Sequence, residues 1–179
     1  MSHEFEVPER IDPDLNASEM DTLMGFLRYQ RATVLRKVEG LTVTQWRARP
    51  TVSALSLAGI VKHLAFVEES WILEDFLAQP LPEPWACVDW EADRDWELHS
   101  ALRDDPRWLV QRYQQTWRTV EEVIEAASPG DLSAHELTVG GIRRRVSLRW
   151  ILLHLIEETA RHNGHADIIR EAIDGSTGE

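Results

Sequence analysis

The sequence predicts an all-α protein, a four-helix bundle whose helices are joined by long crossover connections. Four long segments repeat apolar residues at three- and four-residue spacing, which lines one face of a helix. Each segment follows a serine or an aspartate that can cap a helix N-terminus. The stretches between them hold no alternating pattern long enough for a credible sheet. Amphipathic helices must bury their apolar faces against one another, so a bundle is the expected arrangement.

The first two predicted helices cover residues 18–39 and 56–78. Ser18 offers the first an N-cap, and Gly40 stops it. Ser56 caps the second, which ends before three closely spaced prolines because proline cannot continue a helix. A turn-rich segment separates the two helices, and it is long enough to cross an end of the bundle.

The third and fourth predicted helices complete the bundle. An aspartate before Pro106 starts the third, which ends near Ala127. Ser147 caps the fourth, which continues to about Asp174 and stops at Gly175. Handedness and helix order do not follow from the periodicity.

The remaining segments are connections or an extension. A chain of 179 residues is long enough for one domain and too short for two, so we expect an N-terminal extension at 1–16 and a bundle domain at 17–179. The connection at 80–104 holds three tryptophans, which need a surface to bury against. It could line the functional site, or it could cap the bundle end or a dimer interface. Residues 131–146 place two glycines between β-prone stretches, typical of a short hairpin or an irregular loop.

The composition argues against several classes of protein. The formal net charge is -12, opposite in sign to that of proteins that neutralise phosphates, so we expect no nucleic-acid partner. The basic run at 143–145 is typical of a solvated turn. No run approaches the roughly 20 apolar residues of a membrane span, and the N-terminus lacks the apolar stretch of a signal peptide. One cysteine, Cys87, cannot form an internal disulfide. We therefore expect a cytoplasmic protein with no membrane partner.

Five ionisable residues fall on helix faces that are otherwise apolar. His154, Glu158, His162 and His165 lie within an arc of about 80° on the fourth predicted helix. His63 lies on the apolar face of the second. Such groups are costly to bury without a partner, but they could satisfy one another around a divalent cation. Glu158 and His162 form an i,i+4 pair that could bind a metal together, with His63 as a third ligand. The alternative for each alone is a hydrogen-bonded core residue or a surface ion pair.

Two stretches of the sequence resemble the DinB/YfiT-like superfamily. Residues 57–71 (LAGIVKHLAFVEESW) resemble its second helix, and residues 147–167 (SLRWILLHLIEETARHNGHAD) resemble its metal-binding fourth helix. The closer resemblance is to an uncharacterised actinobacterial branch related to mycothiol-dependent maleylpyruvate isomerase, and it spans nearly the whole chain. It implies a four-helix bundle that holds a divalent metal, zinc or nickel. Histidine and carboxylate side chains also suit iron, so the identity of the metal stays open.

The resemblance also implies which residues bind the metal. The family's first ligand falls on His63, and its two fourth-helix ligands fall on Glu158 and His162, where glutamate replaces the commoner histidine. His165 stands where many relatives have glutamine, which implies a role beside the metal or toward the substrate. For His154 we expect a structural role or a role beside the metal.

Two imidazoles and one carboxylate are the ligand set of a catalytic zinc with an open coordination position. The characterised relatives use low-molecular-weight thiols such as mycothiol or bacillithiol. We therefore expect a metal-dependent transferase or isomerase with a thiol cosubstrate and a small-molecule substrate, assembled as a homodimer. Arg149 and the neighbouring basic run could bind a carboxylate of the cosubstrate. The alternatives are a non-catalytic bundle that binds a metal or a small ligand, and a dimeric interaction protein whose site has decayed.

Overall fold

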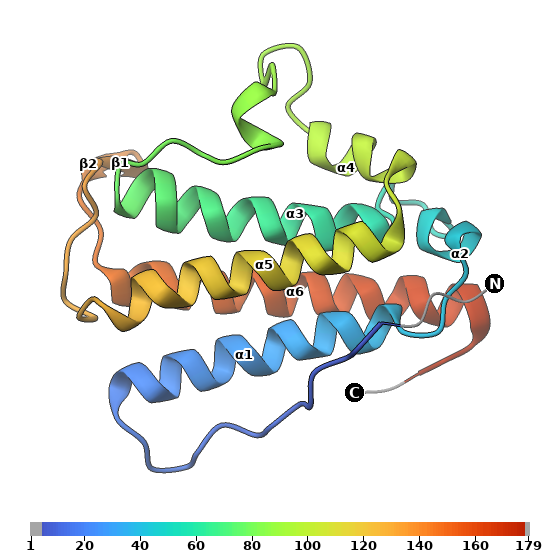
Figure 1. Cartoon of the computed structure of the whole chain (residues 1–179), viewed down its shortest axis with the longest axis horizontal. Helices are drawn as coiled ribbons and strands as arrows, with labels where there is room; N and C mark the ends of the chain where they lie inside the picture. The colour runs from blue at the N-terminus through green and yellow to red at the C-terminus, as the bar shows by residue number, and fades with distance from the viewer. Residues whose placement is uncertain (1–4, 178–179) are drawn as a thin grey trace.

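Four long helices lie side by side in the computed structural model, which describes residues 5–177 (Figure 1). The predicted all-α class is confirmed, because one small hairpin provides the only strands in this part of the chain. Residues 1–4 of the predicted extension and residues 178–179 of the predicted domain lie outside the described residues. The long helices are α1 (Glu19–Val38), α3 (Leu57–Glu69), α5 (Pro106–Glu125) and α6 (Leu148–Asp174).

Each long helix begins at a side-chain cap. Ser18, Ser56, Asp105 and Ser147 accept hydrogen bonds from backbone amides two or three residues further along the chain. These bonds satisfy donors that the first turn of a helix leaves without a partner. Gly175 ends α6 in the left-handed conformation, with φ of 76°. The predicted starts of all four helices and the end of the last are confirmed.

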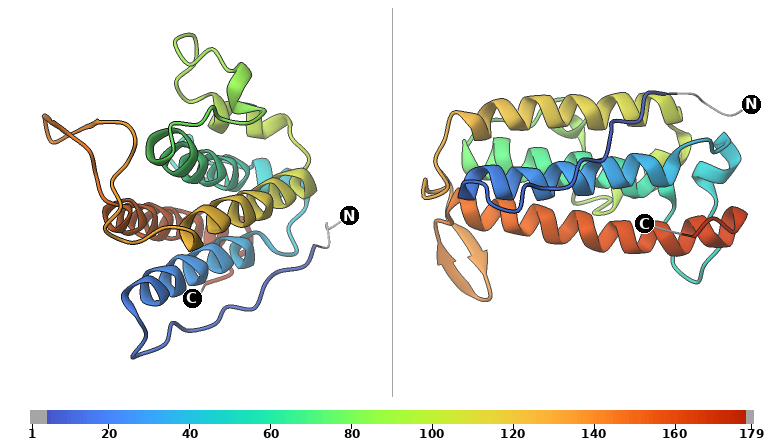
Figure 2. Two further views of the ribbon diagram at one scale, coloured as in Figure 1. Left: turned by 60° about the vertical axis from the view of Figure 1, so that its left-hand side comes forward. Right: turned by 90° about the horizontal axis from the view of Figure 1, so that it is seen from below.

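The directions of the helices decide how they are connected. Figures 1 and 2 show that α1 and α6 run in one direction, whereas α3 and α5 run in the other. Because α3 and α5 are parallel, the chain returns along the length of the bundle between them. The predicted long crossover is therefore present at this connection, but it follows α3 instead of crossing one bundle end. We refer to residues 77–105 as the crossover.

The crossover is ordered by an aromatic cluster on the outer side of α3. Phe66 of α3 stacks on Trp90 with ring centroids 4.5 Å apart, and it contacts buried Trp85 at 5.3 Å. Trp96 meets the ring of Trp85 edge-on. The tryptophans thus pack along the helix that carries His63, and their predicted role at the functional site, the bundle end or a dimer interface stays a prediction. The short helical segments of the crossover are Trp85–Cys87, α4 (Trp96–Ser100) and Ala101–Arg103.

Three shorter features complete the chain. Beyond Glu69, α3 widens into a π-helix over Ser70–Phe76. The first connection contains α2 (Val43–Arg47), which begins at a capping box that the sequence analysis did not predict. Strands β1 (Leu137–Val139) and β2 (Ile142–Arg144) pair antiparallel around two glycines with positive φ, which confirms the predicted hairpin. The hairpin projects from one end of the bundle (Figure 2).

The hydrophobic core fills the space between the four helices in two clusters. One cluster lies around α2 and includes Trp46, and the other lies toward the hairpin and includes Leu148. In the stretch from residue 5 to residue 177, no helix combines the length and the apolar character needed to cross a bilayer.

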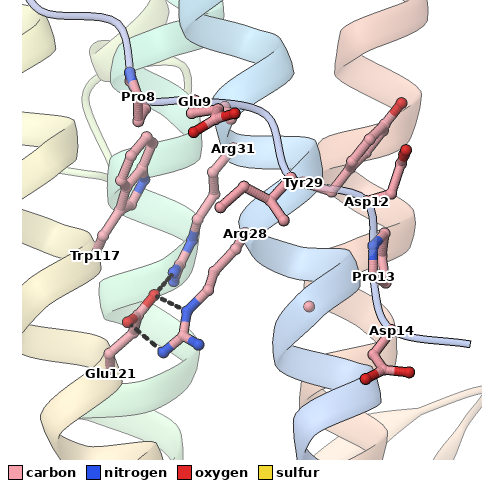
Figure 3. A pocket seen from close by; sticks show the side chains of 13 residues that line it. Pro8, Glu9, Asp12, Pro13, Asp14, Arg28, Tyr29, Arg31, Trp117 and Glu121 are labelled. Carbon is pink, nitrogen blue, oxygen red and sulfur yellow. Dashed lines mark hydrogen bonds and ion pairs between the residues drawn. The ribbon is translucent and has the colours of Figure 1, made fainter. Parts of the chain in front are cut away.

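The described part of the predicted extension packs on the bundle (Figures 1 and 3). Phe5 meets the ring of Trp46 edge-on at 6.3 Å, and Arg10 lies over the ring of Tyr29. Pro13 lies so near α1 that a Cβ added at Gly25 would stand 3.2 Å from it, so glycine permits this approach. A pocket of about 510 Å³ lies between this segment and helices α1 and α5.

Charged residues of α3 that lie off its apolar face are nevertheless buried. Glu68 forms an ion pair with Arg31 of α1 at 2.6 Å, and both side chains are only 1% exposed. Glu69 accepts hydrogen bonds from Trp85 at 2.6 Å and from Arg112 of α5 at 2.8 Å. Helix α3 has no free polar face, because α5, α6 and the crossover all pack against it.

The buried pair predicts a large effect on stability. Arg31→Met leaves the Glu68 carboxylate without a cationic partner in the core and should lower the free energy of unfolding by about 3–5 kcal/mol. The matched control is Arg28→Met, because Arg28 is half exposed and pairs with partly exposed Glu121. That change should cost about 1 kcal/mol or less. Urea unfolding curves measure both, and equal losses in the two variants would contradict the prediction.

Candidate metal centre

Three of the five inward-facing ionisable residues meet between α3 and α6. The donor atoms of His63, Glu158 and His162 all lie within 4.8 Å of one another. Glu158 Oε1 stands 3.4 Å from His63 Nε2 and 3.2 Å from His162 Nε2. The i,i+4 spacing stacks Glu158 and His162 on one face of α6, and α3 supplies His63 from the facing side. Two imidazole nitrogens and one carboxylate oxygen therefore converge.

The three side chains differ in their affinity for protons. The hydrogen bond with His63 lowers the pKa of Glu158 to about 2. Burial lowers the pKa of His63, but its hydrogen bonds with Glu158 and Glu97 outweigh burial and raise that pKa to about 9. Burial and the nearby charge of His63 lower the pKa of His162 to about 4. In the protein alone at neutral pH, Glu158 is therefore ionised, His162 is neutral, and His63 carries the proton.

Glu97 of α4 positions His63 from the side opposite Glu158. Its Oε1 lies 2.9 Å from His63 Nδ1, and the residue is buried. A carboxylate on the outer nitrogen of a histidine fixes the ring orientation and directs the other nitrogen toward a metal. Glu97 was not among the predicted site residues, because it is one of many acids in the aperiodic segment 80–104 and no sequence signal distinguishes it.

His165 lies beside the three residues without joining them. Its ring meets the ring of His162 edge-on, with centroids 5.2 Å apart. Its Nδ1 is buried and has no hydrogen-bond partner within the described part of the chain. This position agrees with the predicted role beside the metal or toward the substrate, which stays a prediction.

His154 and Arg149 lie further toward the hairpin end of α6. His154 stacks on Trp150 with ring planes 14° apart, and it meets Trp71 edge-on at 4.7 Å. Arg149 forms an ion pair with Glu19 of α1, with Nη2 2.9 Å from Oε2. His154 therefore lies about one helical turn from Glu158 on α6. Arg149 instead points toward the first turn of α1.

The donor set fits a divalent cation. Imidazole nitrogen and carboxylate oxygen suit zinc, nickel and iron. The second oxygen of Glu158 is held by Arg161 at 3.1 Å, which leaves Oε1 facing both histidines. No other group of three His, Cys, Asp or Glu side chains with converging donor atoms occurs within residues 5–177.

Comparison with known proteins identifies the family. A family model described as mycothiol-S-transferase matches residues 22–175, which include helices α3, α5 and α6, all but the first three residues of α1, and the three converging residues. The chain belongs to the mycothiol-S-transferase family. This family is part of the DinB/YfiT-like superfamily, so the resemblance found in the sequence is confirmed. None of the curated proteins searched matches the chain.

The pKa of His63 predicts how metal binding depends on pH. Binding must displace one proton from His63, because Glu158 and His162 are already deprotonated near neutral pH. The affinity for Zn²⁺ should therefore rise about tenfold per pH unit below the pKa of His63 and level off above it. Competition with a chromophoric chelator of known protonation measures this slope. A slope of zero, or of two protons, would contradict the charge assignment.

The contact between Glu97 and His63 predicts a second effect on the dependence of Zn²⁺ affinity on pH. Glu97→Gln removes a charge that raises the pKa of His63, so the affinity should level off at lower pH. The affinity on the plateau should fall about tenfold or more, because the ring loses the carboxylate that orients it. The matched control is Asp93→Asn, an acid of the crossover that pairs with exposed His99. If both variants show the same dependence of Zn²⁺ affinity on pH as the wild type, Glu97 does not orient His63 for metal binding.

Proposed function

We propose that this protein is a metal-dependent transferase that uses mycothiol, or a similar low-molecular-weight thiol, and joins its sulfur to an electrophilic small molecule. One observation carries the proposal: the donor atoms of His63, Glu158 and His162 converge within the segment that matches the mycothiol-S-transferase family. The family supports the thiol and the transfer, and the donor set supports the metal. A cytoplasmic location and a homodimer stay predictions from the sequence.

The proposed reaction needs a thiol in its reactive form. A divalent metal at these residues would supply a positive charge that lowers the pKa of a thiol, which then reacts as the thiolate at neutral pH. In the transfer, the sulfur forms a bond to an electrophilic carbon of the substrate. The leaving group departs with the bonding electrons, and the proton of the thiol is released to solvent.

The protein side chains hold the charges that this chemistry requires. Glu158 supplies one negative charge beside two imidazoles, so the site is less positive than a site of three histidines. Arg161 fixes the outer oxygen of Glu158, and Glu97 fixes the ring of His63. These contacts orient the ligand atoms before any metal or substrate binds, which lowers the cost of organising the site.

The number of ligands supports a catalytic role over a structural one. Structural zinc usually has four protein ligands, whereas catalytic zinc has three and an open position. Neither His154 nor His165 places a donor atom in the converging group within the described residues. A non-catalytic bundle with a structural cation is therefore the less favoured alternative.

The proposal is tested by removing each ligand. His63→Ala, Glu158→Ala and His162→Ala should each reduce zinc to below about a tenth of an ion per chain after reconstitution. Each should also slow thiol transfer by about 100-fold or more, because the metal no longer activates the thiol. Elemental analysis and the rate of mycothiol consumption with an alkylating agent measure these effects.

The control is His99→Ala, because His99 is exposed, pairs with Asp93 and does not belong to the converging group. This variant should keep both the metal and the rate. A wild-type protein that is fully loaded with metal but consumes no thiol would refute the transferase. A wild-type protein that takes up no zinc, nickel or iron would refute the metal site.

A further inference from the structure

A small pocket opens beside His165, about one helical turn along α6 from His162. Its volume is about 250 Å³. The first connection of the chain forms one side with Thr51, Val52 and Leu55, and α6 forms the other with His165 and Ile168. Most of the side chains that line it are apolar.

The rim of this pocket carries exposed apolar side chains. Val52 is fully exposed and Ile168 is 60% exposed. Grouped apolar side chains on the surface of a soluble protein mark binding sites more often than single ones do. Side-chain oxygens of Thr51 and Ser53 accept backbone hydrogen bonds from Ser53 and Leu55, so the loop is held in shape.

His165 links the pocket to the metal centre. It lines the pocket, and its ring packs against the ring of His162. A ligand in the pocket would therefore be separated from the converging donor atoms by a single imidazole. One nitrogen of this ring, Nδ1, is buried and has no hydrogen-bond partner among residues 5–177.

The size of the pocket favours one of the two substrates. A dry protein cavity of about 150 Å³ binds benzene. A pocket of about 250 Å³ thus accommodates one substituted aromatic ring or a short branched chain. A thiol that carries sugar hydroxyls, as mycothiol does, is too large for this volume, and its hydroxyls would find few partners in an apolar lining.

We propose that this pocket binds the apolar part of the electrophilic substrate, with the reactive carbon directed toward the metal centre. His165 then donates or accepts a hydrogen bond at a polar atom next to that carbon. The identity of the ligand as an electrophile rests on the proposed transferase function, whereas the preference for a small apolar group rests on the pocket alone.

The first test measures binding without any reaction. Benzyl alcohol serves as an unreactive probe, and saturation-transfer NMR with a concentration series gives its affinity for the metal-loaded protein. Ile168→Trp places an indole over the pocket and should weaken binding about tenfold. The matched control is Leu153→Trp, because Leu153 is 52% exposed on the same helix, about 22 Å away along the helix axis. It should leave binding unchanged. Equal affinities in all three proteins would overturn the proposal.

The second test measures selectivity in thiol transfer. Benzyl chloride and 2-chloroacetamide share a leaving group but differ in apolar size, and each rate is corrected for reaction without mycothiol. The ratio of kcat/KM for benzyl chloride over 2-chloroacetamide should fall about tenfold in Ile168→Trp and stay constant in Leu153→Trp. An unchanged ratio in Ile168→Trp would overturn the pocket and leave the transferase standing.

If wild type transfers thiol to neither compound, the transferase proposal fails. In that case, benzyl alcohol binding that is weakened in Ile168→Trp but not in Leu153→Trp would still support the pocket as a site for a small apolar group.

Discussion

The parallel course of α3 and α5 is the constraint on which most of this structure depends. Two neighbouring helices with the same direction require a connection as long as the bundle itself. That connection packs along α3 through its tryptophans and covers a face that would otherwise meet solvent. The same covering carries Glu97 to His63. Thus the topology of the bundle, the burial of α3 and the orientation of one metal-ligand candidate have a common origin.

Burial of α3 makes its charged residues selective for particular neighbours. Glu68 is neutralised by Arg31 of α1, and Glu69 by Arg112 of α5. Ion pairs of this kind add little net stability, since desolvation offsets much of the attraction. An incorrect neighbour would leave a carboxylate in the core without a cation, which is strongly unfavourable. We interpret these pairs as fixing which helices lie beside α3 and in which register.

The sequence predicted the parts of the fold that local patterns encode. Apolar periodicity and capping residues predicted the four long helices. Positions on the helical wheel indicated the inward-facing ionisable residues, and the family resemblance selected three of them as candidate ligands. The five-residue helix α2 is too short for a periodic signal, and the π-helix at Ser70–Phe76 uses a spacing that helical periodicity does not detect. Glu97 and the buried carboxylates Glu68 and Glu69 depend on what packs against α3. Such contacts between distant segments leave no trace in the spacing of residues along one helix.

The origin of Glu97 in the crossover has a thermodynamic consequence. His63 belongs to a long helix of the bundle, but the group that orients it belongs to a connection. Aromatic contacts and the hydrogen bonds of Trp85 with Glu69 and of Lys62 with Ser100 hold this connection on α3. Ligand binding stabilises whatever structure it requires, by linkage. Any affinity that the metal gains from an ordered Glu97 must therefore appear as resistance of the crossover to local unfolding. Metal binding at the three converging residues and protection of the crossover from local unfolding therefore depend on the same equilibrium, and either one can be measured to follow it.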